Sequence, residues 1–224
     1  MIRLFARVFH KELEFSKIVG YEDVKDVVNR ALDTEDNINL LLDGPPASAK
    51  SLFLREIQEN KKALFFDATN CSGPALLDTL NENRDAKILL IDELEKMARN
   101  FQNMLLNMME TGHVTVNLRS RRYDFVMKNV KIFATSNDVE RISRPMLSRF
   151  RKLTLPAYTK EEFLLISARV LPKLKEETAR YIAECVWGME SKDIRNVISI
   201  GKLVRKGDGP LEIARLIETM EKYK

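Results

Sequence analysis

The sequence predicts an α/β fold in which a parallel sheet lies between helices, followed by a small all-helical domain. Two observations predict it. Short apolar runs of strand length alternate with helical segments up to about residue 156, and only helical periodicity follows. Alternation of strands with helices is typical of a parallel sheet. We therefore expect an α/β domain over residues 1–156 and a helical lid over residues 157–224.

The buried strands are expected at short apolar runs that are bounded by turn residues. These runs are Ile38–Leu42, Ala63–Phe66, Ile88–Ile91 and Val130–Thr135. Helical periodicity marks Val24–Leu32, Ser51–Asn60, Pro74–Asn83 and Glu95–Glu110. Alternation of apolar and polar residues at Val114–Leu118, with a return over Tyr123–Met127, predicts a β-hairpin. Breaks near Pro172, Gly188 and 206–210 divide the helical tail.

Composition places few limits on function. The 224 residues carry a formal net charge of +4, which neither requires nor excludes a nucleic-acid partner. Cys71 and Cys185 lack metal-ligand spacing and indicate reduced thiols in the cytoplasm. No apolar run reaches the roughly 18 residues that a membrane helix needs. We therefore expect a cytoplasmic protein without membrane contact.

A phosphate-binding loop is expected between the first strand and the helix that follows it. The segment Gly44–Ser51 fits the pattern GxxxxGK[ST] except at Ala49. Backbone N–H groups turned inward by such a loop form an anion site, to which the helix N-terminus adds partial positive charge. The residues expected to hold phosphate are Gly44, Pro45, Pro46, Ala47, Ser48, Ala49, Lys50, Ser51 and Leu52.

Within this loop, Lys50 would reach the β- and γ-phosphates, and the Ser51 hydroxyl would bind Mg²⁺. Ala49 stands where the pattern has its second glycine. Alanine is acceptable there if the position is already helical. The alternative interpretation is an ordinary turn that starts a helix.

Two acids end the third apolar run. Asp92 would hold Mg²⁺, and Glu93 would polarise the attacking water as a general base. Adjacent acids at a buried strand end cost desolvation energy unless a cation or hydrogen bonds offset it. A surface loop after a core strand is the alternative. Together, the two motifs predict an enzyme that binds Mg-ATP and hydrolyses it to ADP and phosphate.

These motifs resemble those of the AAA+ ATPases, and the resemblance covers nearly the whole chain. It implies a P-loop AAA+ core with a C-terminal helical lid. Val130–Asn137 is similar to the sensor 1 strand, which implies that Asn137 contacts the γ-phosphate or the attacking water. The alternative for Asn137 is the cap of a turn.

Two arginines are assigned by the same resemblance. Arg144–Phe150 is similar to the segment of the arginine finger, which implies that Arg149 completes a neighbour's site; Arg144 and Arg151 are close enough to compete. Ser191–Asn196 is similar to the start of the sensor 2 helix, which implies that Arg195 reaches the γ-phosphate. Either arginine could instead be a solvated surface charge.

Further resemblances concern adenine and assembly. Phe15–Glu22 is similar to the segment that packs on adenine, which assigns Val19 and Gly20 to nucleotide binding; a helix-entry contact is the alternative. A finger donated to a neighbour implies a homo-oligomeric, hexamer-like ring or spiral.

The expected hairpin precedes the sensor 1 strand, as in RuvB-type motors, MoxR-type chaperones and minichromosome maintenance helicases. The resemblance implies that Arg119, Arg121 and Arg122 face a central pore, where they would suit a phosphate backbone. Charges that protect an exposed hairpin are the alternative. Three uses of ATP stay open: a motor on DNA, a chaperone that remodels a protein partner, and an ATP-gated assembly scaffold.

Overall fold

The computed structural model describes residues 12–118, 121–189 and 191–223. Two compact units make up the chain. The first unit runs to Leu155 without Pro45–Ser48, and the second contains those four residues and the chain from Pro156 onward. Each unit is described by itself.

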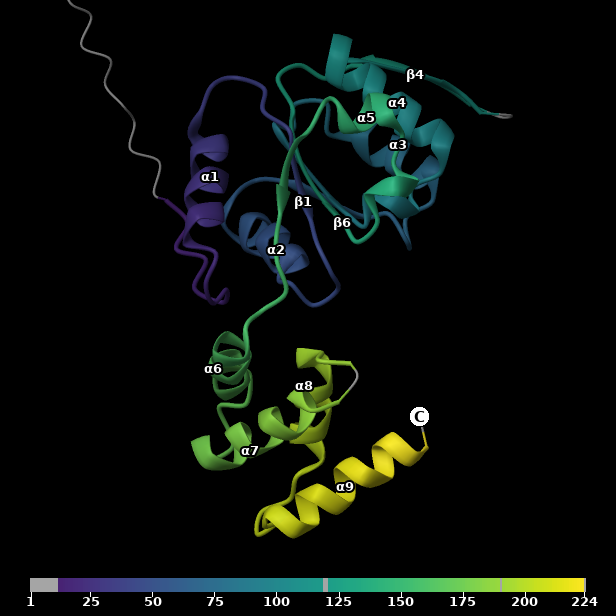
Figure 1. Cartoon of the computed structure of the whole chain (residues 1–224). Coiled ribbons are helices and arrows are strands. Elements are labelled where there is room, and N and C mark those ends of the chain that lie inside the picture. The colour runs from purple at the N-terminus through teal and green to yellow at the C-terminus, as the bar shows by residue number, and fades with distance from the viewer. Residues whose placement is uncertain (1–11, 119–120, 190, 224) are drawn as a thin grey trace, which may run out of the picture. The chain divides into compact units, whose positions relative to one another are not determined.

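A parallel five-stranded sheet forms the centre of the first unit (Figure 1). The strand order is β2-β3-β6-β1-β7, and every pairing is parallel. The strands are β1 (Leu40–Asp43), β2 (Leu64–Asp67), β3 (Ile88–Asp92), β6 (Lys131–Ser136) and β7 (Arg151–Thr154). Their carboxyl ends share one edge, where the register pairs Asp67 with Asp92 and Asp43 with Ser136. The predicted parallel sheet is confirmed.

Helices cover both faces of this sheet. Figure 1 shows α1 and α2 on one side and α3, α4 and α5 on the other. Their bounds are α1 (Glu22–Asp33), α2 (Lys50–Asn60), α3 (Gly73–Glu82), α4 (Arg99–Thr111) and α5 (Arg144–Leu147). Leu41 and Ile91 point to the second side, where they share a buried cluster with Leu77 of α3 and Leu105 of α4. Each such side chain contributes about 1.5–3 kcal/mol by leaving water.

The expected hairpin is present before β6. It consists of β4 (His113–Asn117) and β5 (Arg122–Val126), which pair antiparallel. One of its faces is apolar, and Val114 and Phe125 of that face belong to the same buried cluster as α3 and α4. The hairpin therefore packs on the body of the first unit along its apolar face.

Two elements differ from expectation. The helix expected over Glu95–Glu110 is interrupted, because the 3-10 turn η1 (Leu94–Lys96) is followed by extended backbone before α4 begins at Arg99. The buried Gln102 amide donates to the Met97 carbonyl at 3.0 Å, which satisfies an acceptor at this break. No strand was expected at β7, whose residues are exposed except for the half-buried Leu153 and so lack an apolar pattern.

Four helices make up most of the second unit, with breaks where the sequence predicted them. They are α6 (Lys160–Val170), α7 (Glu176–Trp187), α8 (Ile194–Leu203) and α9 (Pro210–Lys222). Thr159 caps α6 in a reciprocal pair of hydrogen bonds with Glu162. Phe163, Ile182 and Val197 form part of the buried core of the second unit. In the part of the chain that the structure describes, every helix is too short or too polar to cross a bilayer.

The turn before α2 has a backbone that the sequence did not predict. Ala49 precedes the helix with φ 63° and ψ 2°, in the left-handed region. The condition under which alanine was acceptable here, a helical backbone, is therefore not met. A residue with a Cβ atom pays about 1–2 kcal/mol in this region, and glycine avoids that cost. The glycine in the usual pattern thus has a conformational reason that holds here too.

We expect Ala49→Gly to raise the free energy of unfolding by about 0.5–1 kcal/mol, because relief of backbone strain exceeds the added freedom of the unfolded chain. Urea unfolding monitored by circular dichroism measures the change. The control is Ala75→Gly in α3, which should lower the free energy of unfolding by about 0.5–1 kcal/mol. Equal destabilisation by both substitutions would contradict the strain.

Candidate functional site

The predicted phosphate loop connects β1 to α2 at the carboxyl edge of the sheet. Lys50 is 5% exposed, and its ammonium group donates to the Gly44 carbonyl at 2.8 Å. Burial lowers the pKa of Lys50, whereas the charges of Asp43, Glu95, Asp92 and Glu93 act in the opposite direction. The Lys50 ammonium group is thus held against the start of the loop, and four carboxylates favour its charged form.

A hydrogen bond and two left-handed residues shape the loop between Gly44 and Lys50. The buried Ser48 hydroxyl donates to the Pro45 carbonyl at 2.8 Å. Ala47, like Ala49, is left-handed with φ 63°. Left-handed residues within a turn are one way in which a loop can aim successive N–H groups into a concave anion site.

Asp92, at the end of β3, accepts hydrogen bonds from two hydroxyl groups. Ser51 Oγ donates to Asp92 Oδ1 at 2.9 Å, and Thr135 Oγ1 of the adjacent β6 donates to the same oxygen at 2.5 Å. The bond from Ser51 joins the first turn of α2 to the acidic strand end. Thr135 adds a link that the sequence did not reveal.

The oxygens of Ser51 and Asp92 fit a magnesium ion. Mg²⁺ prefers oxygen ligands and usually binds one or two protein groups together with phosphate oxygens and water. Within the described ranges, no group of three or more acidic, histidine or cysteine residues could hold a metal by protein ligands alone.

Glu93 lies in a strained and restrained position. Its backbone is left-handed, with φ 55° and ψ 51°. Asn137 Nδ2 donates to Oε1 of Glu93 at 3.2 Å, and Thr69 Oγ1 donates to Oε2 at 2.5 Å. The Glu93 N–H donates to Thr135 Oγ1 at 2.9 Å. Such strain persists only where the surroundings hold the residue in place, which is common at functional sites.

Sequence reasoning missed Thr69 and Thr135. Thr135 is the first polar residue after the apolar run 132–134, two residues before Asn137. Thr69 lies two residues after β2, at the same sheet edge as Asp92. Polar residues just beyond the ends of neighbouring parallel strands meet at one edge, and that rule could have identified Thr69.

Val19 and Gly20 belong to a segment that lies against α2. The Phe15 ring is 5.1 Å from the Phe53 ring, and the Lys17 N–H donates to Glu56 Oε1 at 3.3 Å. Val19 is buried and Gly20 is left-handed with φ 71°. The adenine contact of these two residues stays a prediction.

The structure gives Arg149 and Arg195 partners outside this hydrogen-bonded cluster. Arg149 Nε donates to Glu110 Oε1 of α4 at 3.0 Å, and its Nη2 contacts the same oxygen. Arg195, in the second unit, donates to Asp193 Oδ2 through Nε at 2.8 Å and Nη2 at 2.6 Å. The roles of both arginines as finger and sensor stay predictions.

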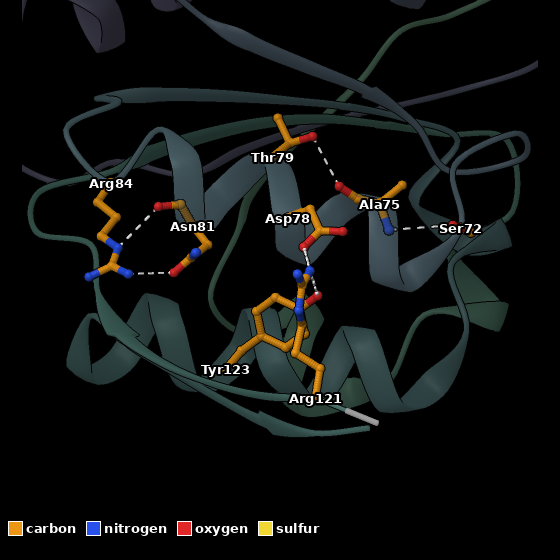
Figure 2. A network of polar contacts seen from close by, with 8 residues as sticks. All are labelled: Ser72, Ala75, Asp78, Thr79, Asn81, Arg84, Arg121 and Tyr123. Atoms are coloured by element: carbon orange, nitrogen blue, oxygen red, sulfur yellow. Dashed lines mark hydrogen bonds and ion pairs between the residues drawn. The ribbon is translucent and has the colours of Figure 1, made fainter. Parts of the chain in front are cut away.

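Figure 2 shows how the end of the hairpin is fastened to α3. Tyr123 Oη donates to Asp78 Oδ1 at 2.8 Å, and Arg121 donates both to Asp78 and to Tyr123 Oη. Arg122 Nη2 contacts Asp124 Oδ2 at 2.9 Å. Arg119 lies outside the described residues. Acids therefore offset the charge of both described arginines in this predicted basic group.

Comparisons with known proteins identify the family of the chain and its fold. A family model described as AAA domain (Cdc48 subfamily) matches residues 35–167, which is more than half of the chain. Among curated proteins, the Lon protease of Leptospira interrogans is 28% identical over 184 residues, covering 68% of this chain and 22% of the protease. The chain thus spans less than a quarter of that relative's length.

Solved structures of RuvB from Thermotoga maritima have the same fold. One mutant gives a TM-score of 0.72 at 17% identity, covering 93% of this chain and 73% of the RuvB chain. Another structure, described as a Holliday junction branch migration motor, gives 0.65 at 18% identity, with 90% and 70% covered. The P-loop α/β fold with C-terminal helices is thereby confirmed as the AAA+ fold.

The matched residues contain the phosphate loop, both acids and Asn137. Fold, motif order and family model agree, and the chain belongs to the AAA domain family (Cdc48 subfamily) of AAA+ ATPases.

Proposed function

We propose that this chain binds Mg-ATP, hydrolyses it to ADP and phosphate, and works as one subunit of a ring. The hydrogen-bonded cluster at the sheet edge carries the proposal. It brings Ser51 of α2, Asp92 at the end of β3, the following Glu93, and Asn137 after β6 into one connected group. The charges of Asp92 and Glu93 also act on the buried Lys50. Each residue type suits one requirement of phosphoryl transfer to water.

Nucleotide binding is assigned to the loop and to the segment beside α2. The residues Gly44–Leu52 would hold the phosphates, and Val19 and Gly20 would contact adenine. Lys50 would exchange the Gly44 carbonyl for β- and γ-phosphate oxygens. Ser51 and Asp92 would hold Mg²⁺, which supplies charge neutralisation at the phosphate oxygens when bound.

Hydrolysis breaks the bond between the γ-phosphorus and the bridging oxygen of ADP while a water oxygen bonds to that phosphorus. Glu93 would accept the proton of this water as the general base. Asn137 and Thr69 fix the two carboxylate oxygens, so that Glu93 keeps one orientation. Arg149 from a neighbouring subunit and Arg195 would stabilise charge on the transferred group.

Glu93→Gln should retain nucleotide binding and lower kcat at least about 100-fold, because an amide cannot accept the water proton. Phosphate release measures kcat, and calorimetry measures ATP affinity. Glu59→Gln, on the exposed side of α2, is the matched control and should keep the wild-type rate. Wild-type protein that ignores Mg-ATP in calorimetry would refute the proposal, and full activity of Glu93→Gln would refute the role of that carboxylate.

The ring requires Arg149 to act in trans. Glu93→Gln and Arg149→Ala should each be inactive alone, and an equal mixture should recover activity at about a quarter of its interfaces. Those interfaces combine an intact Glu93 with an intact Arg149 from the neighbour. Light scattering in ADP and in a non-hydrolysable ATP analogue gives the assembly state. A mixture as inactive as its components would contradict a finger in trans.

For the substrate, we favour DNA, by analogy with the RuvB motor whose fold this chain shares. Such a motor would work in the cytoplasm. The hairpin residues Arg119, Arg121 and Arg122 would face the strand, although Asp78 and Asp124 offset two of those charges. That balance, and the similarity to a protein named as a protease, favour the remodelling of a protein partner as the second candidate.

Charge substitutions separate these two substrates. If DNA binds the hairpin, Asp78→Asn with Asp124→Asn should tighten binding, because it exposes the charge of Arg121 and Arg122. Arg121→Gln with Arg122→Gln should weaken binding and reduce the slope against salt by about one per residue. Fluorescence anisotropy over a salt series measures both. ATPase activity that DNA leaves unchanged and an unfolded protein stimulates would support the second candidate.

A further inference from the structure

A third acid lies in the turn that follows Asp92 and Glu93. Glu95 is 7% exposed, and its Oε1 accepts the backbone N–H of Asn137 at 3.1 Å. Its other carboxylate oxygen, Oε2, is buried without a hydrogen-bond partner among the described residues. Asn137 is thus held at two points, by Glu95 at its backbone and by Glu93 at its side-chain amide.

The backbone explains how Glu95 comes to point inward. Glu93 is left-handed, so the chain leaves the line of β3 and forms the 3-10 turn η1. This turn buries Leu94 and Glu95, and it places the Glu95 carboxylate beside the end of β6. A buried carboxylate with one unbonded oxygen lowers the stability of the fold, and a functional role is one explanation for such a group in a native structure.

A second buried side chain after β3, Gln102, also accepts a backbone N–H from the segment that follows β6. Gln102 is 2% exposed, donates to the Met97 carbonyl, and accepts the Ser143 N–H at 3.3 Å. Ser143 directly precedes α5. The segment after β3 therefore holds the segment after β6 at Asn137 and again at Ser143.

We propose that Glu95 is a positioning residue for ATP hydrolysis, which fixes the backbone of Asn137 so that its amide stays on Glu93. The inference rests on the proposed ATPase function. Glu95 acts through Asn137, so its loss should affect turnover more than nucleotide affinity. A displacement of about 1 Å at a reacting group can cost about 100-fold in rate.

Two variants separate the effect of the length of the Glu95 side chain from the effect of its charge. Glu95→Gln keeps the length of the side chain and an oxygen acceptor but removes the charge. Glu95→Asp keeps the charge but withdraws the carboxylate by one methylene. If Glu95 acts by its hydrogen bond, Glu95→Gln should keep kcat within about 3-fold of wild type, and Glu95→Asp should lower it about 10-fold or more, with KM for ATP within about 3-fold in both.

Hydrogen–deuterium exchange gives a readout that does not need turnover. Exchange at the Asn137 amide should accelerate in Glu95→Asp and stay close to wild type in Glu95→Gln. Glu56→Gln is the matched control, because Glu56 of α2 is an equally buried acid whose carboxylate accepts the Lys17 N–H. It should change neither kcat nor exchange at Asn137.

The opposite order, in which Glu95→Asp retains kcat and Glu95→Gln loses it, would overturn the inference and assign Glu95 a role through its charge. Equal kcat in wild type and both variants would overturn it as well. A wild-type protein without ATPase activity would count against the proposed function alone. In that case, unchanged exchange at Asn137 in Glu95→Asp would still overturn the positioning role.

Discussion

The pair of hydroxyl bonds to Asp92 is the interaction on which the arrangement of the site depends. Ser51 approaches from the helix after β1, and Thr135 approaches from β6, so that Asp92 joins the chain segments of three adjacent strands. This convergence is possible because the strands are parallel and end at one edge. An antiparallel neighbour would place its connection at the opposite edge. The direction of the strands is therefore a condition for the chemistry that we propose.

The places of the motif residues at strand ends were predictable because the signals for them are local. The segment Gly44–Ser51 and the pair Asp92–Glu93 each combine a strand end with a turn, and both signals are contiguous in the sequence. Helical periodicity, which is also a local signal, predicted the helices of the second unit. The predicted strands at the core, such as β1 and β3, carry short apolar runs followed by turn or acidic residues, which favours a buried strand.

What sequence reasoning missed depends on contacts distant in the chain or on backbone angles. Thr69 and Glu95 gain significance only through partners 24 and 42 residues away. The left-handed conformation of Ala49 opposes the ordinary preference of alanine, so no propensity could predict it. Strand β7 is an exposed edge strand that forms by pairing with β1, and its own residues carry no apolar alternation.

The ion pair between Arg149 and Glu110 has a consequence for assembly if Arg149 is the finger that we propose. The guanidinium is already neutralised inside its own subunit, so docking against a neighbour replaces one anionic partner by another. A single carboxylate is a weaker competitor than a triphosphate with its bound cation, and ADP offers less negative charge than ATP. The exchange would therefore favour ATP-loaded neighbours. By competing for Arg149, Glu110 would make subunit association selective for the state of the nucleotide that the neighbour binds.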